Sequence, residues 1–132
     1  MGVDETMIVA GIGSRKGVAA ADVLAAIDAA LGAHGLTRGQ IDRLATAELK
    51  QNEPALGAAS ATIGRELTIV NDAALSAASS RTLTHSELSL AMTGAPSVSE
   101  ASALAAAGPA SRLLGPRLVV GSVTCAIAVS ET

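Results

Sequence analysis

The chain contains no phenylalanine, tyrosine or tryptophan, although 49% of its 132 residues are hydrophobic. Alanine, leucine, valine and isoleucine must therefore form the whole core. Because alanine buries little surface per side chain, helices and strands must approach one another closely. The absence of aromatic rings argues against stacking on nucleobases, and the net charge of −3 argues against a nucleic-acid surface. The length predicts one domain over residues 1–132.

Apolar runs and helical periodicities alternate along the chain. We expect strands at 6–10, 44–47 and 66–70, each followed by a helix, at 18–31, 54–63 and 73–78. Helix starts are signalled by Thr37 with Gln40, by Pro54, by Asn71 or Asp72, and by Ser97 with Glu100. Two apolar runs after residue 111, divided at Gly121 and Ser122, predict antiparallel strands at a sheet edge. The expected fold is an α/β, three-layer βαβ-type domain with a mostly parallel sheet and a C-terminal antiparallel hairpin.

Residues 11–17 read Gly-Ile-Gly-Ser-Arg-Lys-Gly and follow the first apolar run directly. Glycines between a strand and a helix start are typical of anion sites, because the first helical amides lack intrahelical acceptors. Arg15 and Lys16 add positive charge at the same place. The spacing fits neither the dinucleotide fingerprint nor a P-loop. The pattern alone leaves two interpretations open, a phosphate or carboxylate site and a tight turn without a ligand.

Polar residues also follow the second strand. Glu48, Lys50 and Glu53 cluster there, which is typical either of general acid–base chemistry or of a solvated loop before a helix. Ligands of open α/β sheets bind beyond the carboxyl ends of the strands. We therefore expect residues 11–17, residues 46–53 and the turn at Asn71 and Asp72 to share one end of the sheet.

Several site types are not supported by the sequence. Cys125 lies in an apolar run and is interpreted as a buried core thiol. His34 and His85 have no neighbours at metal-ligand spacing, so we expect no metal and no cofactor. No nucleophile–base pair can be identified. No apolar stretch has transmembrane length, and Asp4 and Glu5 stand where a signal peptide would be basic, which predicts a soluble cytoplasmic protein without membrane contact.

Four segments, in order, resemble one family, the CobE proteins and the C-terminal domain of CbiG proteins. Residues 11–17 are similar to the family pattern G-I-G-C-R-(K/R)-G, and residues 44–56 to L-A-T-x-D-L-K-x-(D/N)-E-P-G-L. Residues 97–104 resemble S-V-A-E-A-A-A-L, and residues 122–128 resemble the strand V-T-V-A-I-A. Ser14 stands in place of the usual cysteine, Glu48 in place of aspartate, and Leu118 to Val120 occupy a hairpin that is usually basic. Residues 79–94 match poorly.

The resemblance implies a role at the corrin-ring stage of cobalamin biosynthesis, with a carboxylate-rich precorrin or other corrinoid intermediate as ligand and other enzymes of the pathway as partners. CbiG proteins open a ring lactone of a cobalt-precorrin and carry an additional N-terminal domain, whereas a stand-alone domain resembles CobE. Hydrolysis and binding without turnover are both left open. The expected ligand-binding residues lie in the matched segments: Gly11, Gly13, Ser14, Arg15, Lys16, Gly17, Thr46, Glu48, Lys50, Glu53, Ser97 and Glu100. For Glu100, helix capping is the competing interpretation.

Two functions from other classes compete with this one. A Rossmann-like module would bind a nucleotide or phosphate at residues 11–17, although its glycine spacing departs from the fingerprint. A partner-binding domain would form a homodimer through the apolar edge at Leu118 to Val120.

Overall fold

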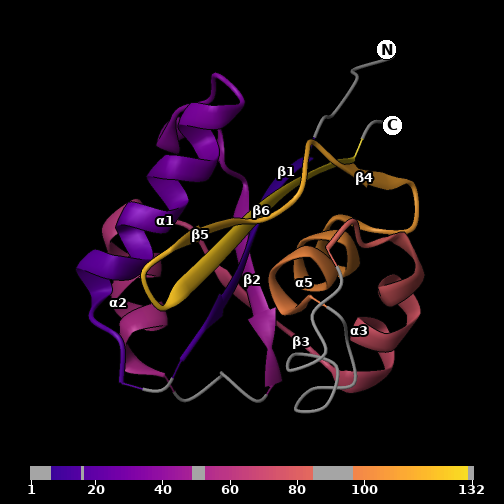
Figure 1. Cartoon of the computed structure of the whole chain (residues 1–132), viewed down its shortest axis with the longest axis horizontal. Helices are drawn as coiled ribbons and strands as arrows, with labels where there is room; N and C mark the ends of the chain where they lie inside the picture. The colour runs from indigo at the N-terminus through magenta and orange to yellow at the C-terminus, as the bar shows by residue number, and fades with distance from the viewer. Residues whose placement is uncertain (1–6, 16, 49–52, 85–96, 131–132) are drawn as a thin grey trace.

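The computed structural model describes residues 7–15, 17–48, 53–84 and 97–130 (Figure 1). Strands and helices alternate through most of the chain. In chain order the elements are β1 (Met7–Ser14), α1 (Ala20–Ala33), the 3₁₀ turn η1 (Arg38–Gln40), β2 (Arg43–Ala47), α2 (Pro54–Ile63), β3 (Leu67–Val70), α3 (Asp72–Ala78), η3 (Ser79–Arg81), α5 (Val98–Ala107), β4 (Ser111–Leu113), β5 (Leu118–Val120) and β6 (Val123–Ser130). No helix in these four ranges is long and apolar enough to cross a membrane.

One sheet runs through the molecule in the order β3-β2-β1-β6-β4, and β5 also pairs with β6. Strands β1, β2 and β3 are parallel, whereas β6 runs antiparallel to β1, β4 and β5. The expected α/β class with a mostly parallel sheet and a C-terminal antiparallel hairpin is confirmed. The hairpin differs in one respect from the expectation, because β6 pairs along its whole length with β1 and lies inside the sheet. Among the described strands, β4 and β5 form that edge.

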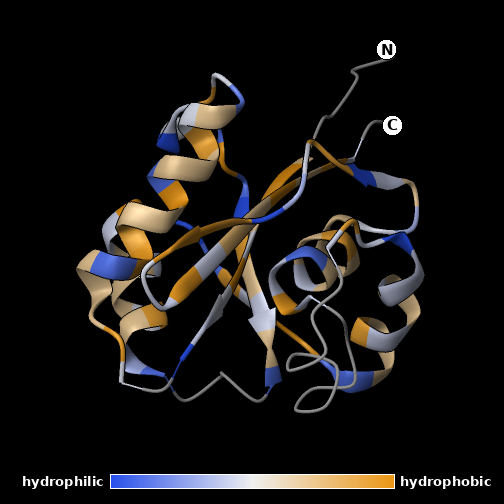
Figure 2. Cartoon of the chain, viewed as in Figure 1, coloured by the Kyte–Doolittle hydropathy of each residue, from blue (hydrophilic) through white to orange (hydrophobic). Residues whose placement is uncertain are grey.

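Helices cover both faces of the sheet (Figure 1). One core cluster packs α1 and α2 against Ala10, Ile12, Leu44 and Ile127, and the other packs α3 and α5 against the opposite face. The cores are built from aliphatic side chains, and β5 and β6 are drawn mostly in the colour of apolar residues in Figure 2. Alternation along the strands thus produces the three layers.

Strand β1 is longer than the sequence suggested. It continues through Gly11, Ile12 and Gly13 to Ser14, so these residues are strand and not loop. The glycines serve close packing: a Cβ on Gly11 would lie 2.0 Å from the carbonyl oxygen of Ser99, and one on Gly13 would lie 2.8 Å from Oγ1 of Thr124. Helix α5 therefore approaches β1 at a distance that a side chain would prevent, as a core without aromatic residues requires.

The predicted apolar edge at β5 is mostly covered. Leu118 and Val120 pack against the core beneath α1, and only Val119 is exposed, with 62% of its surface accessible. Alternation in the strand turns Val119 to the α5 face of the sheet. An edge dimer through all three side chains would therefore lack most of the apolar surface that was expected for it.

Candidate functional site

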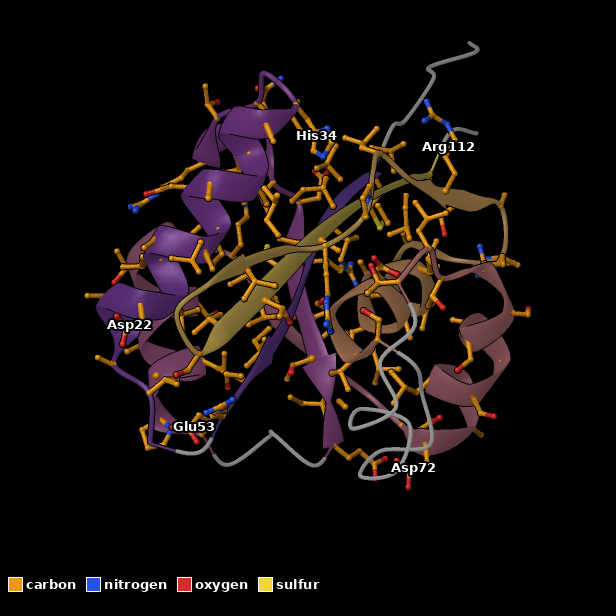
Figure 3. All side chains as sticks on the ribbon, viewed as in Figure 1. Asp22, His34, Glu53, Asp72 and Arg112 are labelled. Atoms are coloured by element: carbon orange, nitrogen blue, oxygen red, sulfur yellow. The ribbon has the colours of Figure 1, made fainter. Side chains whose placement is uncertain are left out.

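The described residues of the three segments predicted to share one end of the sheet do so. We call this end, at which β1, β2 and β3 finish, the carboxyl end of the sheet. Figure 3 shows Glu53 and Asp72 there, while His34 and Arg112 lie at the opposite end. The turn between β5 and β6 also lies at the carboxyl end, because Ser14 pairs with Val123 and the amide of Arg15 donates to the carbonyl of Ser122 at 3.1 Å.

The turn from β1 into α1 is held by the protein's own carboxylates. The amide of Gly17 donates to Oε2 of Glu53 at 3.3 Å, and the amide of Ala19 donates to Oδ2 of Asp22 at 3.3 Å. Gly17 has φ of +80°, so this is the position in the segment at which glycine meets a backbone requirement. Two amides that a phosphate would use already have acceptors. This geometry, and the packing of Gly11 and Gly13 against α5, does not favour the nucleotide-binding alternative.

The residues after β2 divide between buried and exposed positions. Thr46 is fully buried, and its hydroxyl donates to the carbonyl of Ile12 at 2.8 Å, which fastens the end of β2 to the end of β1. Glu48 is exposed. The predicted site residues Lys16 and Lys50 lie outside the described residues. Of the predicted cations at this end, only Arg15 is therefore described, and its position is exposed.

Ser14 ends β1 in a half-buried position. Its Oγ is buried and has no hydrogen-bond partner among the residues that the structure describes, which is uncommon for a polar atom inside a protein. The serine that replaces the family's cysteine thus retains an unused polar group at the predicted site.

Glu100 is buried inside the protein, which the sequence did not predict. Its side chain is fully buried in the first turn of α5. Oε1 accepts hydrogen bonds from the amides of Leu83 and Thr84, each at 2.7 Å. Oε2 accepts from the hydroxyl of Thr84 at 2.6 Å and from the amide of Arg117 at 2.8 Å.

These four donors explain how an acidic group is tolerated inside the protein, since a buried carboxylate without partners is costly. The carboxylate does not return to cap its own helix. Ser97 does cap α5, because its Oγ accepts from the amide of Glu100 at 3.5 Å. Both oxygens of Glu100 are occupied by the protein itself, so the structure gives Glu100 a positioning role that differs from the predicted contact with a ligand.

Arg117, Leu83 and Thr84 were missed by sequence reasoning. Their common feature is a backbone amide bound to Glu100, 16 or 17 residues away along the chain. The only local signal was the Gly115-Pro116 turn, which interrupts the edge between β4 and β5. A turn of this kind predicts that strand pairing is interrupted. It does not predict that the carboxylate of Glu100 binds the amide of Arg117 there.

Charge is unevenly distributed across the carboxyl end. Exposed Glu48 and Asp72 follow β2 and β3 at this end, whereas exposed Arg15 follows β1. Arg117 precedes β5 and therefore lies at the end of that strand opposite to the β5–β6 turn. Among the described residues, no salt bridge involves Arg15 or Arg117; the salt bridge in these ranges joins Arg38 to Asp28 on α1. The carboxylates of Glu53 and Asp22 are directed to backbone amides. We call the side of this end that carries Arg15 the cationic half; Glu53 and Asp22 lie there too, with their carboxylates bound to backbone amides. We call the side that carries Glu48 and Asp72 the acidic half.

The sequence analysis did not support a reactive cysteine or a metal site. Cys125 is fully buried, and burial raises the pKa of its thiol to about 12, which confirms the interpretation as a core residue. Within the described ranges, no three His, Cys, Asp or Glu side chains are grouped closely enough to hold a metal ion.

Comparisons with known proteins agree on one family. The sequence family described as Cobalamin synthesis G C-terminus matches residues 8–128. Protein CobE from Sinorhizobium sp. is 31% identical over 125 residues, which are 95% of this chain and 81% of that protein. The crystal structure of a CobE from the cobalamin biosynthetic pathway superimposes with a TM-score of 0.93 at 31% identity, covering 100% of this chain and 97% of the other.

Two further solved structures are similar. The cobalamin biosynthesis protein chiG of Agrobacterium tumefaciens is 50% identical, with a TM-score of 0.75 over 94% of this chain and 98% of that one. A cobalamin biosynthesis protein G homologue of Sulfolobus solfataricus shares the fold at 24% identity, with a TM-score of 0.69 over 96% of this chain and 37% of the other.

Proposed function

The chain belongs to the cobalamin-biosynthesis family of CobE proteins and CbiG C-terminal domains, and from this premise we propose that it binds a carboxylate-rich corrin-ring intermediate at the cationic half of its carboxyl end. The observation that carries the proposal is the position of Arg15. Arg15 is exposed, follows the central strand β1 and donates its backbone amide to the β5–β6 turn, at the end of the sheet where α/β proteins bind ligands. A guanidinium group is well matched to carboxylates because it can donate two parallel hydrogen bonds.

The distribution of charge supports the choice of this half. Glu48 and Asp72 would repel a polycarboxylate at the β2–β3 side, whereas Glu53 and Asp22 are directed to amides of the β1–α1 turn. On this proposal Glu53 holds the turn in place, and Lys16 adds a second cation beside Arg15. Thr46 acts through the same scaffold, since its hydroxyl joins the ends of β1 and β2. Ser97 and Glu100 position α5 beneath the site.

The test is a titration of the protein with cobyrinic acid, followed by ligand absorbance and by calorimetry. We expect saturable one-to-one binding that weakens as salt is added, because exposed charges are screened. Arg15→Ala should weaken binding by about tenfold, corresponding to one charge-assisted contact. Arg112→Ala removes an exposed arginine at the opposite end of the sheet and serves as the matched control.

The proposal is rejected if cobyrinic acid neither binds nor stabilises the wild-type protein at saturating concentration. It is also rejected if Arg15→Ala and Arg112→Ala weaken binding equally, since the loss would then reflect net charge. A separate assay for opening of the ring lactone of a cobalt-precorrin, the reaction that the resemblance to CbiG proteins implies, distinguishes a hydrolase from a binding protein.

A further inference from the structure

The carboxylate of Glu100 brings together two segments that are far apart in the sequence. Leu83 and Thr84 lie on one side of it and Arg117 on the other, each held through its backbone amide at 2.7 or 2.8 Å. Glu100 binds only the backbone amides of Leu83 and Arg117. Their side chains are therefore not used in these contacts. Arg117 is partly buried, and its guanidinium group donates no hydrogen bond to another described residue.

In the described ranges, two large hydrophobic side chains are exposed. They are Leu83 and Val119, with 60% and 62% of their surfaces accessible. Alternation in β5 places Val119 on the α5 face of the sheet. The amide of Arg117, two residues earlier, bonds to Glu100 of α5. The two exposed hydrophobic residues thus flank one arginine at the margin of α5. We call Leu83, Arg117 and Val119 the α5-side ledge.

The ledge is continuous with the carboxyl end of the sheet. Val119 pairs with Thr124, and Thr124 pairs in turn with Gly13 of β1. One step further on, the amide of Arg15 bonds to Ser122 in the β5–β6 turn. From the carboxyl end to the margin of α5, the residues Arg15, Val119, Arg117 and Leu83 therefore follow one another, positive and apolar in turn.

We infer that the α5-side ledge receives the apolar face of the corrin ring while Arg15 and Arg117 bind carboxylates at its rim, an inference that rests on the proposed function. The chemistry of the ledge selects this occupant. A macrocycle with acidic substituents presents a flat apolar centre surrounded by negative charge, and the ledge presents apolar side chains between cations. A protein partner is less well matched, because two apolar side chains are far fewer than a stable interface needs.

The inference is tested with Arg117→Ala and Val119→Thr in the cobyrinic acid titration. Neither change removes the Arg117 amide that bonds to Glu100, and threonine keeps the shape and strand preference of valine. We expect Arg117→Ala to weaken binding about tenfold and to reduce its salt dependence. Val119→Thr should weaken binding about threefold with an unchanged salt dependence, as expected for the loss of an apolar contact. Arg112→Ala, on the neighbouring edge strand β4, is the control for both.

The outcomes separate this inference from the proposed function. If wild-type protein binds and Arg15→Ala weakens binding while both ledge variants bind as wild type, the ligand lies at the carboxyl end only and the ledge is excluded. If wild-type protein does not bind, the proposed function fails and the inference with it. If the ledge variants shift sedimentation from dimer to monomer without changing affinity for cobyrinic acid, the ledge is an interface between copies of the chain and the inference is wrong.

Discussion

The glycine segment contains two regions that look alike in sequence and differ in the structure. Gly11 and Gly13 lie in β1 beneath α5, where a Cβ has no room, and Glu100 of that helix is fully buried with four donors. Gly17 lies in the open turn, where no described atom comes within 4 Å of an added Cβ, and one bond at 3.3 Å links it to Glu53. The first region determines how the helix packs, and the second leaves side chains accessible for a ligand.

The largest difference is expected between Gly11→Ala and Gly17→Ala. The new Cβ at position 11 would lie 2.0 Å from a backbone oxygen that cannot rotate away, so α5 must move. We expect a loss of about 3 kcal/mol or more in the free energy of unfolding, measured by urea denaturation. Gly17→Ala meets no neighbour and should cost about 1 kcal/mol, for the positive φ alone. Equal losses for the two variants would contradict the packing role of Gly11.

The second-largest effect is expected at Glu100, whose carboxylate belongs to the first region. Glu100→Gln places an amide group, which is a donor, opposite donors that now bond to Oε1 and Oε2. We expect a loss of about 2–3 kcal/mol in the free energy of unfolding, as for a buried hydrogen bond to a charged group. Faster hydrogen exchange should appear at the amides of Leu83, Thr84 and Arg117. Unchanged exchange at all three amides would show that Glu100 does not hold them.

Glu53→Gln should have a smaller effect. Its bond to the amide of Gly17 is long, at 3.3 Å, and glutamine can still accept it, so we expect a loss below about 1 kcal/mol. The change also removes a negative charge near Arg15, and cobyrinic acid should therefore bind slightly more tightly. Weaker binding by this variant, with stability unchanged, would indicate that Glu53 contacts the ligand.

The smallest effect is expected for the exposed ion pair between Arg38 and Asp28. This pair belongs to neither of the two regions compared, so its loss gives a reference value for an exposed surface contact. The side-chain hydrogen bond from Arg38 lowers the pKa of Asp28 below its model-peptide value of 3.8. Since the folded-state pKa is depressed, the stabilisation is present above pH 4 and is lost as the pH falls through the folded-state value. Both side chains are about half exposed, so Asp28→Asn should cost about 0.5 kcal/mol at pH 7 and nothing near pH 2. A loss that persists at pH 2 would exclude the ion pair as its cause.

Local signals in the sequence predicted local structure well. Asn71 caps α3 by accepting from the amide of Ala74, Pro54 begins α2, and Gly64 ends that helix with a φ of +77°. The amide of Thr37 donates to Gln40 in the predicted capping arrangement. Each of these signals operates within a few residues, which is why it can be recognised without knowledge of the fold.

Features that depend on distant contacts were not predictable in the same way. Glycine within a strand resembles a turn until the helix that packs on it is known, so β1 was expected to end before Gly11. The partners of Glu100 are 16 and 17 residues away, and its position three residues after Ser97 indicated capping. The convergence of residues 11–17 and 46–53 was predictable because parallel strands end together. The contact of Arg117 with Glu100 likewise depends on how the chain before β5 packs against α5.

The most direct test of the central claim is amide chemical-shift mapping of ¹⁵N-labelled protein during titration with cobyrinic acid. We predict that the largest saturable shifts occur at Arg15, Arg117, Val119 and Ser122, with Arg112 unchanged. Shifts concentrated around Glu48 and Asp72 would contradict a site at the cationic half of the carboxyl end. An absence of saturable shifts would contradict corrinoid binding altogether.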